Sequence, residues 1–436
     1  MDSFAYYYKS IAFDLVLFYY IEGDKMNYNQ TLEYIHSLGN FSLPAGLERM
    51  NKVMEKLDNP QNKIKAIHIA GTNGKGSVSA MLAGIFKTAG YKTGLFISPF
   101  IIDFRERIQI NGEYISCEDM VQYSQRIIDT NVSLTEFEFI TAVAFLYFAE
   151  KEIDILICET GLGGRLDATN ILQNKVVNVI TKIGLDHTAI LGDTIEKITS
   201  EKCGIIRNCP TVTTYNQPDS VLNVIKKYTD RLYIPDKQSL SILNNKIGNT
   251  YIYKGKEYTV ALSGNYQIEN SLVAIETAEV SGYNIPYSII YEGLKNTFFP
   301  ARMEIISQNP LVVLDGAHNP DGAEVLSKEL SKQRNVTAII GMMKDKDVTA
   351  FLEQTLKYCK SAVAVGVSNM PRSISATELC DIASKVCPCD IAEDYETAIK
   401  KTVEKSCGNP IFVFGSLYLA SGIRPFLKDF FKDNLI

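Results

Sequence analysis

The segment Gly71–Ser77, with the sequence GTNGKGS, carries the residue types that bind phosphate groups. Glycines allow successive backbone N–H groups to converge on an anion, and Lys75 adds a mobile positive charge. The hydroxyl of Ser77 is an oxygen ligand of the kind that Mg²⁺ accepts beside a nucleotide. The segment therefore predicts a nucleotide-phosphate site with a metal ion next to it.

The spacing of this segment departs from the general phosphate-loop pattern G-x-x-x-x-G-K-[ST]. It is shorter, and Gly76 stands between Lys75 and Ser77. A glycine-rich turn between a strand and a helix is the alternative interpretation. The apolar run Ala66–Ala70 before the segment and the helical pattern from Val78 after it favour the phosphate site, because a helix N-terminus attracts anions.

Two further predicted strand ends carry polar side chains. Glu159 follows the apolar run Ile153–Cys158. Asp186 and His187 follow the run Val176–Ile183. Because ligands of open α/β sheets bind at the carboxyl ends of the strands, we expect these groups to lie beside the phosphates, where Glu159 can hold a metal ion. A solvated strand end for Glu159 and a structural hydrogen bond for His187 are the alternatives.

The elements that position these groups alternate between apolar strands and helices, a pattern that makes parallel sheets. The helix predicted over Ile195–Ile206 contains Lys202, which this local pattern places among the exposed charges. After a boundary near 296–300 the alternation restarts, and its first strand leads into Asp315 and His318. A second α/β unit is therefore predicted. Its strands are Leu311–Leu314, Val336–Ile340, Ala362–Gly366 and Ile411–Phe414.

The composition of the 436 residues limits the partners of this protein. With 46% hydrophobic residues the chain can form large cores, and its length predicts two or three domains. The net charge of −6 and the absence of long Lys/Arg runs argue against nucleic acid and membranes as partners. Nine scattered cysteines, an odd number, favour reduced thiols and a cytoplasmic location.

Residues 1–25 differ from the rest of the chain. Their apolar run Ile11–Ile21 is interrupted by Asp14 and is too short to span a bilayer. An ordinary helix pattern begins at Met26. We therefore expect translation to start at Met26, and residues 1–25 to contribute nothing to function.

Four motifs in this order resemble those of the folylpolyglutamate synthase/dihydrofolate synthase family, a branch of the Mur ligases. The motifs are Ile69–Ser77, Glu159–Asn170, Gly184–His187 and Asp315–Pro320. The resemblance extends from about Met26 to the C-terminus, and the short phosphate loop is the family's own variant. It implies an α/β fold: a Mur-ligase-like P-loop domain with a parallel sheet, which binds ATP, over residues 26–296, and a smaller Rossmann-like glutamate-ligase domain over 301–436.

The activity that the resemblance implies is ATP-dependent joining of L-glutamate to a folate or to dihydropteroate. Two Mg²⁺ ions, and in some relatives a monovalent cation such as K⁺, would assist. The substrate carboxylate would attack the γ-phosphate of ATP, and the amine of glutamate would displace phosphate from the resulting acyl phosphate. This chemistry needs positive charge around the γ-phosphate in a water-poor cleft. Small-molecule substrates, domain motion and a monomeric state are expected.

Site residues carry over from the family by motif. The expected nucleotide contacts are Thr72, Asn73, Gly74, Lys75, Gly76, Ser77, Asn270, Arg302 and Asp315. The expected metal ligands are Ser77, Glu159, His187 and Lys202. Lys202 matches a lysine that is carbamylated in relatives, and this modification would turn its ammonium group into a carboxylate. The expected catalytic set is Lys75, His187, Lys202, Asp315 and His318.

Some positions depart from the family pattern. Phe100 stands where histidine is frequent, near the expected folate-binding loop, and Ala301 stands where glycine is common. Two other functions are the alternatives: a Mur-type ligase for another substrate, and a nucleotide-binding regulatory protein without turnover. The loop and the Asp315–Pro320 motif argue against the first. The complete set of phosphate and metal residues argues against the second.

Overall fold

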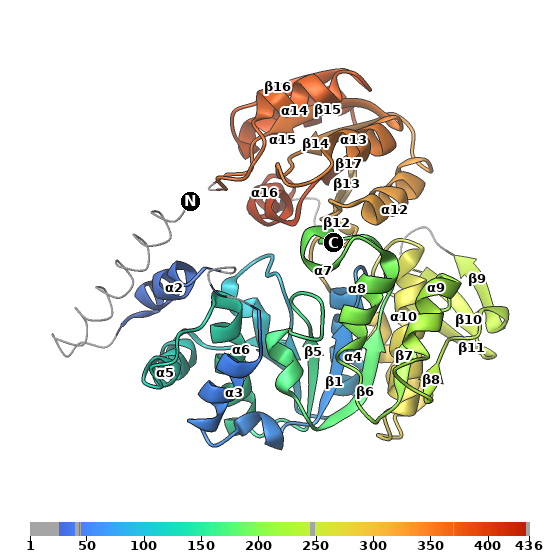
Figure 1. Cartoon of the computed structure of the whole chain (residues 1–436). Helices are drawn as coiled ribbons and strands as arrows, with labels where there is room; N and C mark the ends of the chain where they lie inside the picture. Colours follow the sequence, from blue (N-terminus) through green and yellow to red (C-terminus); the bar gives the residue numbers. More distant parts are fainter. Residues whose placement is uncertain (1–25, 40–42, 44, 245–248, 369, 433–436) are drawn as a thin grey trace. The chain divides into compact units, whose positions relative to one another are not determined.

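The computed structural model describes residues 26–39, 43, 45–244, 249–368 and 370–432 (Figure 1). The proposed extension 1–25 lies outside the described residues. The chain divides into two compact units, Met1–Lys237 with Asn270–Leu294, and Gln238–Glu269 with Lys295–Ile436. Within the described ranges, no helix combines the length and the apolar character that a membrane span requires.

The first unit is built on an eight-stranded sheet (Figure 1). Its strands are β1 (Ala66–Ala70), β2 (Thr93–Phe96), β3 (Ile108–Ile110), β4 (Glu113–Tyr114), β5 (Ile155–Glu159), β6 (Lys175–Ile180), β7 (Thr211–Thr213) and β8 (Leu232–Tyr233). Their spatial order is β4-β3-β2-β5-β1-β6-β7-β8. All pairs from β2 to β8 in this order are parallel, whereas β3 and β4 pair antiparallel at one edge. The predicted parallel sheet is confirmed.

Helices flank this sheet, and β1 and β5 are buried along their whole length. The helices up to Lys295 are α2 (Tyr28–Ser37), α3 (Glu48–Glu55), α4 (Lys75–Thr88), α5 (Cys117–Ile128), α6 (Glu136–Glu150), α7 (Thr188–Leu191), α8 (Ile195–Cys203), α9 (Asp219–Ile225), α10 (Tyr266–Val280) and α11 (Tyr287–Lys295). Continuous burial on both faces is what a central parallel strand requires, and it explains the apolar runs that predicted these strands.

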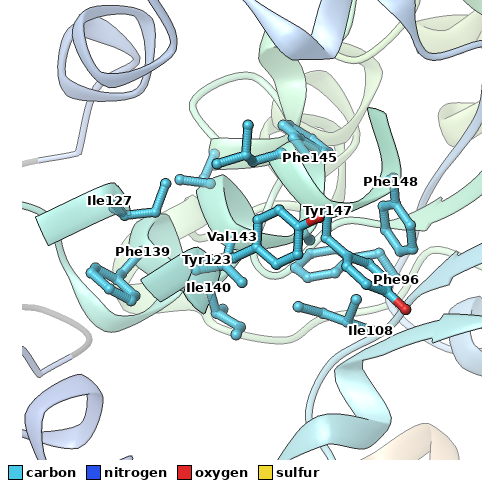
Figure 2. Close-up of a cluster of buried hydrophobic side chains, with 14 of the residues drawn as sticks. Phe96, Ile108, Tyr123, Ile127, Phe139, Ile140, Val143, Phe145, Tyr147 and Phe148 are labelled. Atoms are coloured by element: carbon cyan, nitrogen blue, oxygen red, sulfur yellow. The ribbon is translucent and has the colours of Figure 1, made fainter. Parts of the chain in front are cut away.

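The largest core of this unit gathers around α6. Figure 2 shows its side chains meeting residues of α5, β2 and β3, with Tyr123 of α5 beside Tyr147 of α6. These two rings pack edge to face, with centroids 5.5 Å apart. Helix α6 begins with a capping box, in which Thr135 and Glu138 each bond the other's backbone N–H. Because α6 is buried on almost every face, it has no polar stripe, as expected of a helix inside a core.

The second unit contains a six-stranded sheet and a separate three-stranded antiparallel sheet. The strands of the larger sheet are β12 (Glu304–Gln308), β13 (Leu311–Leu314), β14 (Val336–Ile340), β15 (Cys359–Val365), β16 (Cys389–Ala392) and β17 (Ile411–Phe414), in the order β12-β13-β17-β14-β15-β16. The smaller sheet has β9 (Leu240–Asn244), β10 (Asn249–Tyr253) and β11 (Lys256–Val260). The helices are α12 (Pro320–Leu330), α13 (Val348–Leu356), α14 (Ala376–Ala383), α15 (Tyr395–Ser406) and α16 (Leu417–Phe430).

The four strands predicted for this unit are present, with shifted limits at β15, and β12 and β16 are additional. Strand β12 is antiparallel to β13, while the other pairs of the larger sheet are parallel. Its Glu304 is buried and paired with Arg424 of α16. A buried carboxylate interrupts the apolar pattern by which strands are recognised, so the sequence did not indicate β12.

Candidate functional site

The phosphate-loop residues lie between β1 and α4. Gly74 precedes α4 with a φ of 89°, a left-handed conformation that glycine adopts without steric cost. The helix therefore begins at Lys75, and the prediction that it begins at Val78 was wrong by one turn. Because the N–H groups of a first helical turn lack intrahelical acceptors, the turn Lys75–Ser77 can bind an anion.

The loop is held by the segment that follows β6. The N–H groups of Thr72 and Asn73 donate to the carbonyl oxygen of Lys182 at 2.9 and 3.1 Å. The hydroxyl of Thr72 bonds both the N–H and the carbonyl of Gly184, each at 3.1 Å. These contacts fix the backbone from which the phosphate-binding turn starts.

Asn270, at the N-terminal part of α10, lies directly against Gly74. A Cβ atom on Gly74 would stand only 2.4 Å from Asn270 Oδ1. The residue predicted to contact the nucleotide is therefore adjacent to the loop, and a side chain at position 74 would collide with it.

A cavity of about 30 Å³ opens where three neighbouring strands end. It is lined by the loop after β1, by residues 160–163 after β5, by Asp186 and His187 after β6, and by Lys202 of α8. Such a volume holds about two water-sized groups. The structure thus brings together the three polar strand ends. Residues 160–163 were not assigned a role from the sequence, although their glycines indicate close backbone approach.

Lys75 lines this cavity, and Glu159 lies next to Lys75 without lining the cavity. Lys75 Nζ lies 4.0 Å from Glu159 Oε1 and donates to the carbonyl oxygens of Gly71 and Thr72 at 3.1 and 3.3 Å. Glu159, the last residue of β5, is only 4% exposed, and the N–H of Ser98 donates to its Oε2 at 3.4 Å. The alternative of a solvated strand end is excluded by this burial.

Lys202 is buried, and the prediction of an exposed charge was wrong. It is 5% exposed, and its Nζ donates to the carbonyl oxygen of Gly71 at 2.7 Å. Burial, together with the nearby charge of Lys75, lowers the pKa of Lys202 to about 7. The periodicity of α8 marked its apolar side correctly, but it could not show that the polar side packs against the end of β1.

His187 stands at the edge of the cavity with about half of its side chain exposed (47%). Its backbone is left-handed, with a φ of 50°, and its N–H donates to Asp186 Oδ1 at 2.9 Å. The ring Nε2 lies 3.8 Å from Asp186 Oδ2. This position leaves the imidazole within reach of a group bound in the cavity.

The chemistry of the donor set suits a hard divalent cation. Ser77, in the first turn of α4, and Glu159 are both buried, and hydroxyl and carboxylate oxygens are the ligands that Mg²⁺ accepts. In the part of the chain that the structure describes, no three His, Cys, Asp or Glu side chains converge into a metal site. An ion here would therefore depend on Ser77, on phosphate oxygens or water, and on any further ligand that Lys202 supplies.

The second unit has its own polar strand end after β13. Asp315 is buried, and its two oxygens accept from the N–H groups of Ala317 and Met303, both at 2.8 Å. Burial raises the pKa of Asp315, and the charge of Arg302 opposes this shift. His318 follows, with its Nδ1 2.8 Å from the carbonyl oxygen of Gly316. Because a carbonyl can only accept, Nδ1 carries the proton in the neutral ring, and Nε2 is left as an acceptor.

The backbone around Arg302 explains one departure from the family pattern. Ala301 and Met303, on either side of Arg302, both have left-handed φ values, 52° and 50°. Glycine adopts this conformation without strain, so the glycine that the family resemblance leads us to expect at position 301 would suit this backbone. Here alanine takes it, and its N–H is held by Glu304 Oε2 at 3.0 Å.

Family models match most of the chain. The Mur ligase middle domain matches residues 69–278, and the dihydrofolate synthetase C-terminal domain matches residues 301–427. A dihydrofolate synthase/folylpolyglutamate synthase from Bacillus subtilis (strain 168) is 38% identical over 432 residues, covering 92% of this chain and 99% of the relative.

Solved structures agree with the sequence comparison. E. coli FolC in complex with DHPP and ADP superposes with a TM-score of 0.84 at 26% identity, covering 93% of this chain and 98% of the other. An FPGS-AMPPCP-folate complex superposes with a TM-score of 0.79 at 32% identity, covering 92% of this chain and 100% of the other. Both comparisons cover the two units described above.

Proposed function

The chain belongs to the dihydrofolate synthase/folylpolyglutamate synthase family of Mur ligases, and from this premise we propose how its residues carry out glutamate addition. The protein is an ATP-dependent ligase that adds L-glutamate to folates. We infer that dihydropteroate is a second acceptor. The observation that carries the proposal is the cavity at the ends of β1, β5 and β6, which is lined by two lysines, one of them 4.0 Å from the buried carboxylate of Glu159.

In the first step the acceptor carboxylate attacks the γ-phosphate of ATP, which gives an acyl phosphate and ADP. A carboxylate oxygen is a poor leaving group, and phosphorylation replaces it with a good one. The first turn of α4 binds the triphosphate, with Lys75 neutralising the charge that develops on the transferred group. Asn270 contacts the nucleotide beside Gly74.

Ser77 and Glu159 would hold one Mg²⁺, and His187 would contribute to holding a second. The ions would neutralise the phosphate oxygens during transfer. Glu159 is suited to this because it is buried and fixed by Ser98. A monovalent cation such as K⁺ is a further proposal, carried by the family resemblance alone.

Lys202 is proposed to carry a carbamate. A lysine with a pKa near 7 has a large neutral fraction at physiological pH, and the neutral amine is the form that attacks CO₂. Addition of CO₂ to the neutral Nζ, with loss of one proton, gives a carbamate anion. Relative to the ammonium form two protons are lost, and a cation is replaced by an oxygen ligand. This change would relieve the repulsion between Lys202 and Lys75 and add a metal ligand to the site.

The second unit supplies the remaining groups. Arg302 and Asp315 contact the nucleotide, and His318 acts in the transfer to the glutamate amine. With Nδ1 bonded to the carbonyl oxygen of Gly316, the Nε2 of the neutral His318 ring is an acceptor, which suits a base that receives a proton from that amine. We propose the domain limits 26–296 and 301–436 and a monomeric state.

The test is ATP-dependent incorporation of labelled glutamate, measured separately with dihydropteroate and with a reduced folate. The proposal expects incorporation on the reduced folate and on dihydropteroate, with one ADP formed per glutamate added. If glutamate were incorporated on only one acceptor, the other would not be a substrate of this protein. A folded preparation that incorporates glutamate on neither would contradict the proposed function.

A further inference from the structure

Buried polar side chains connect the 3₁₀ turn Ala168–Ile171, strand β6 and the end of α8. At their centre is Asn170, which is 3% exposed. Asn170 and Lys175 do not line the cavity, and the proposed reaction gives them no part. Burying an amide and an amine is costly unless every group is paired, so their partners show what the cluster does.

The side chain of Asn170 uses its full hydrogen-bonding capacity. Its Nδ2 donates to the carbonyl oxygens of Arg165 and Gly204, both at 3.0 Å. Its Oδ1 accepts from Lys175 Nζ at 2.9 Å and from Arg207 Nη2 at 3.1 Å. The amide therefore joins the loop after β5 to the backbone that follows α8.

The turn that follows α8 receives hydrogen bonds from this cluster. The last carbonyl groups of a helix and the turn after it lack intrahelical partners. Lys175 Nζ donates to the carbonyl oxygen of Ile205 at 2.7 Å, and Arg207 Nη1 donates to that of Gly204 at 3.0 Å. The side chains of Asn170, Lys175 and Arg207 thus donate hydrogen bonds to the carbonyl groups of the turn after α8.

The two backbones that Asn170 joins are in direct contact. The N–H of Arg165 donates to the carbonyl oxygen of Glu201 at 2.8 Å. A Cβ atom on Gly204 would lie 2.5 Å from the Cα of Arg165, and one on Gly164 would lie 2.7 Å from the carbonyl oxygen of Lys202. Because Gly164 and Gly204 have no side chains, the backbone of the loop and that of the helix end are in direct contact, and this contact fixes the distance between them.

We propose that Asn170, supported by Lys175, is a positioning residue for Lys202. By joining the end of α8 to the loop after β5, it keeps the Lys202 side chain directed into the cavity, on the carbonyl oxygen of Gly71. The role of Lys202 in phosphoryl transfer rests on the proposed function. Its placement by Asn170 does not.

The first test measures placement without turnover. Lysine acetylation by a small anhydride, followed by mass spectrometry, reports how accessible Lys202 is in the full-length chain. Asn170→Ala is expected to raise the acetylation rate of Lys202 by about 10-fold, because an opened helix end exposes the amine. Equal rates in the variant and the parent protein would overturn the proposal.

The matched control is Asn178→Ala. Asn178 of β6 is also fully buried, and its hydrogen bonds go to the backbone of Arg207 and to the side chains of Cys209 and Thr211, which come after the turn that Asn170 bonds. Removing its side chain is expected to destabilise the first unit but to leave the acetylation rate of Lys202 within about two-fold of the rate in the parent protein. If both variants raise the rate equally, general loosening explains the result and the proposal fails. Lys175→Met serves in place of Asn170→Ala if that variant does not fold.

The second test asks whether Asn170 acts through Lys202. In a double-mutant cycle on glutamate ligation, Asn170→Ala is expected to lower kcat by about 10-fold, leaving KM for the acceptor within two-fold. In a Lys202→Ala background, measured by single turnover, the same substitution is expected to change the rate by less than about two-fold. Additive effects would overturn the proposal. An inactive parent protein would instead contradict the proposed function and leave the acetylation result standing.

Discussion

Lys75 and Lys202 share one acceptor, the carbonyl oxygen of Gly71, at 3.1 and 2.7 Å. Two lysine side chains therefore converge on the end of β1. Burial of Lys202 and its repulsion by Lys75 favour the neutral form of the Lys202 amine. The positive charge at this point would also attract an anion, such as a triphosphate bound at the first turn of α4.

Replacing Lys75 tests the phosphate site most directly. Lys75→Ala removes the charge next to the first turn of α4 and is expected to lower kcat/KM for ATP by about 10²- to 10⁴-fold. Lys87→Ala, an exposed lysine in the last turn of the same helix, is the control and should change it by less than about two-fold. ADP formation with folate and glutamate is the measurement. Retained turnover in Lys75→Ala would show that this loop does not bind the transferred phosphate.

Gly74 and Gly90 form a matched pair for testing the contact between the loop and α10. Both have left-handed backbones, with φ values of 89° and 88°, but a Cβ atom would meet a neighbour within 4 Å only at Gly74, where Asn270 lies. Both alanine variants should lose about 1 kcal/mol of stability from backbone strain. Gly74→Ala should in addition raise KM for ATP by about 10-fold or more, because Asn270 must move. Equal KM values for ATP in the two variants would show that the contact between Gly74 and Asn270 has no part in nucleotide binding.

Lys175 should make the stability of the first unit depend on pH. Burial, with the charge of Arg207, lowers its pKa from 10.5 to about 7. Between these values the unfolded chain binds the proton more tightly than the folded one, so the free energy of unfolding rises as pH rises, by at most about 1.4 kcal/mol per pH unit from this group. In Lys175→Met, denaturant titrations between about pH 7.5 and 9.5 should show a correspondingly smaller slope.

An exposed lysine of the same unit provides the comparison. Lys226→Met, at the end of α9, should leave the pH slope of the parent protein unchanged. A slope in Lys175→Met identical to that in Lys226→Met would contradict the burial of a neutral amine at position 175.

The second unit should depend strongly on one ion pair. Arg424 of α16 donates to both oxygens of Glu304 in β12 at 2.7 to 3.0 Å, and both side chains are buried. Arg424→Met leaves the buried carboxylate with only the N–H of Ala301 at 3.0 Å and Lys428 Nζ at 3.8 Å. The loss of the guanidinium should cost about 3–5 kcal/mol in the free energy of unfolding. Lys328→Met breaks the exposed pair with Glu324 and should cost less than about 0.5 kcal/mol. Similar costs from chemical denaturation would show that the buried pair does not stabilise this unit.

The sequence by itself determined the features that depend on neighbouring residues. Glycines and a lysine between an apolar strand and a helix predicted a phosphate loop, and Glu159 was correctly placed at the end of β5. The order of strands and helices predicted two α/β units. The strand, turn and helix, the place of Glu159 and the two α/β units are confirmed, because turn chemistry and the alternation of apolar residues are local properties that the chain carries in order. That the turn binds phosphate stays a prediction.

Only the tertiary structure decided the burial of Lys202, the four hydrogen bonds of Asn170 and the pairing of Glu304 with Arg424. The contacts of Lys202 with Gly71, of Glu304 with Arg424, and of Asn170 with Gly204 and Arg207 join residues that are far apart in the chain. Each places a polar group where local periodicity predicts solvent or gives no signal. A charge on a helix is exposed or buried according to what packs against it, and this is set by the fold of the whole unit.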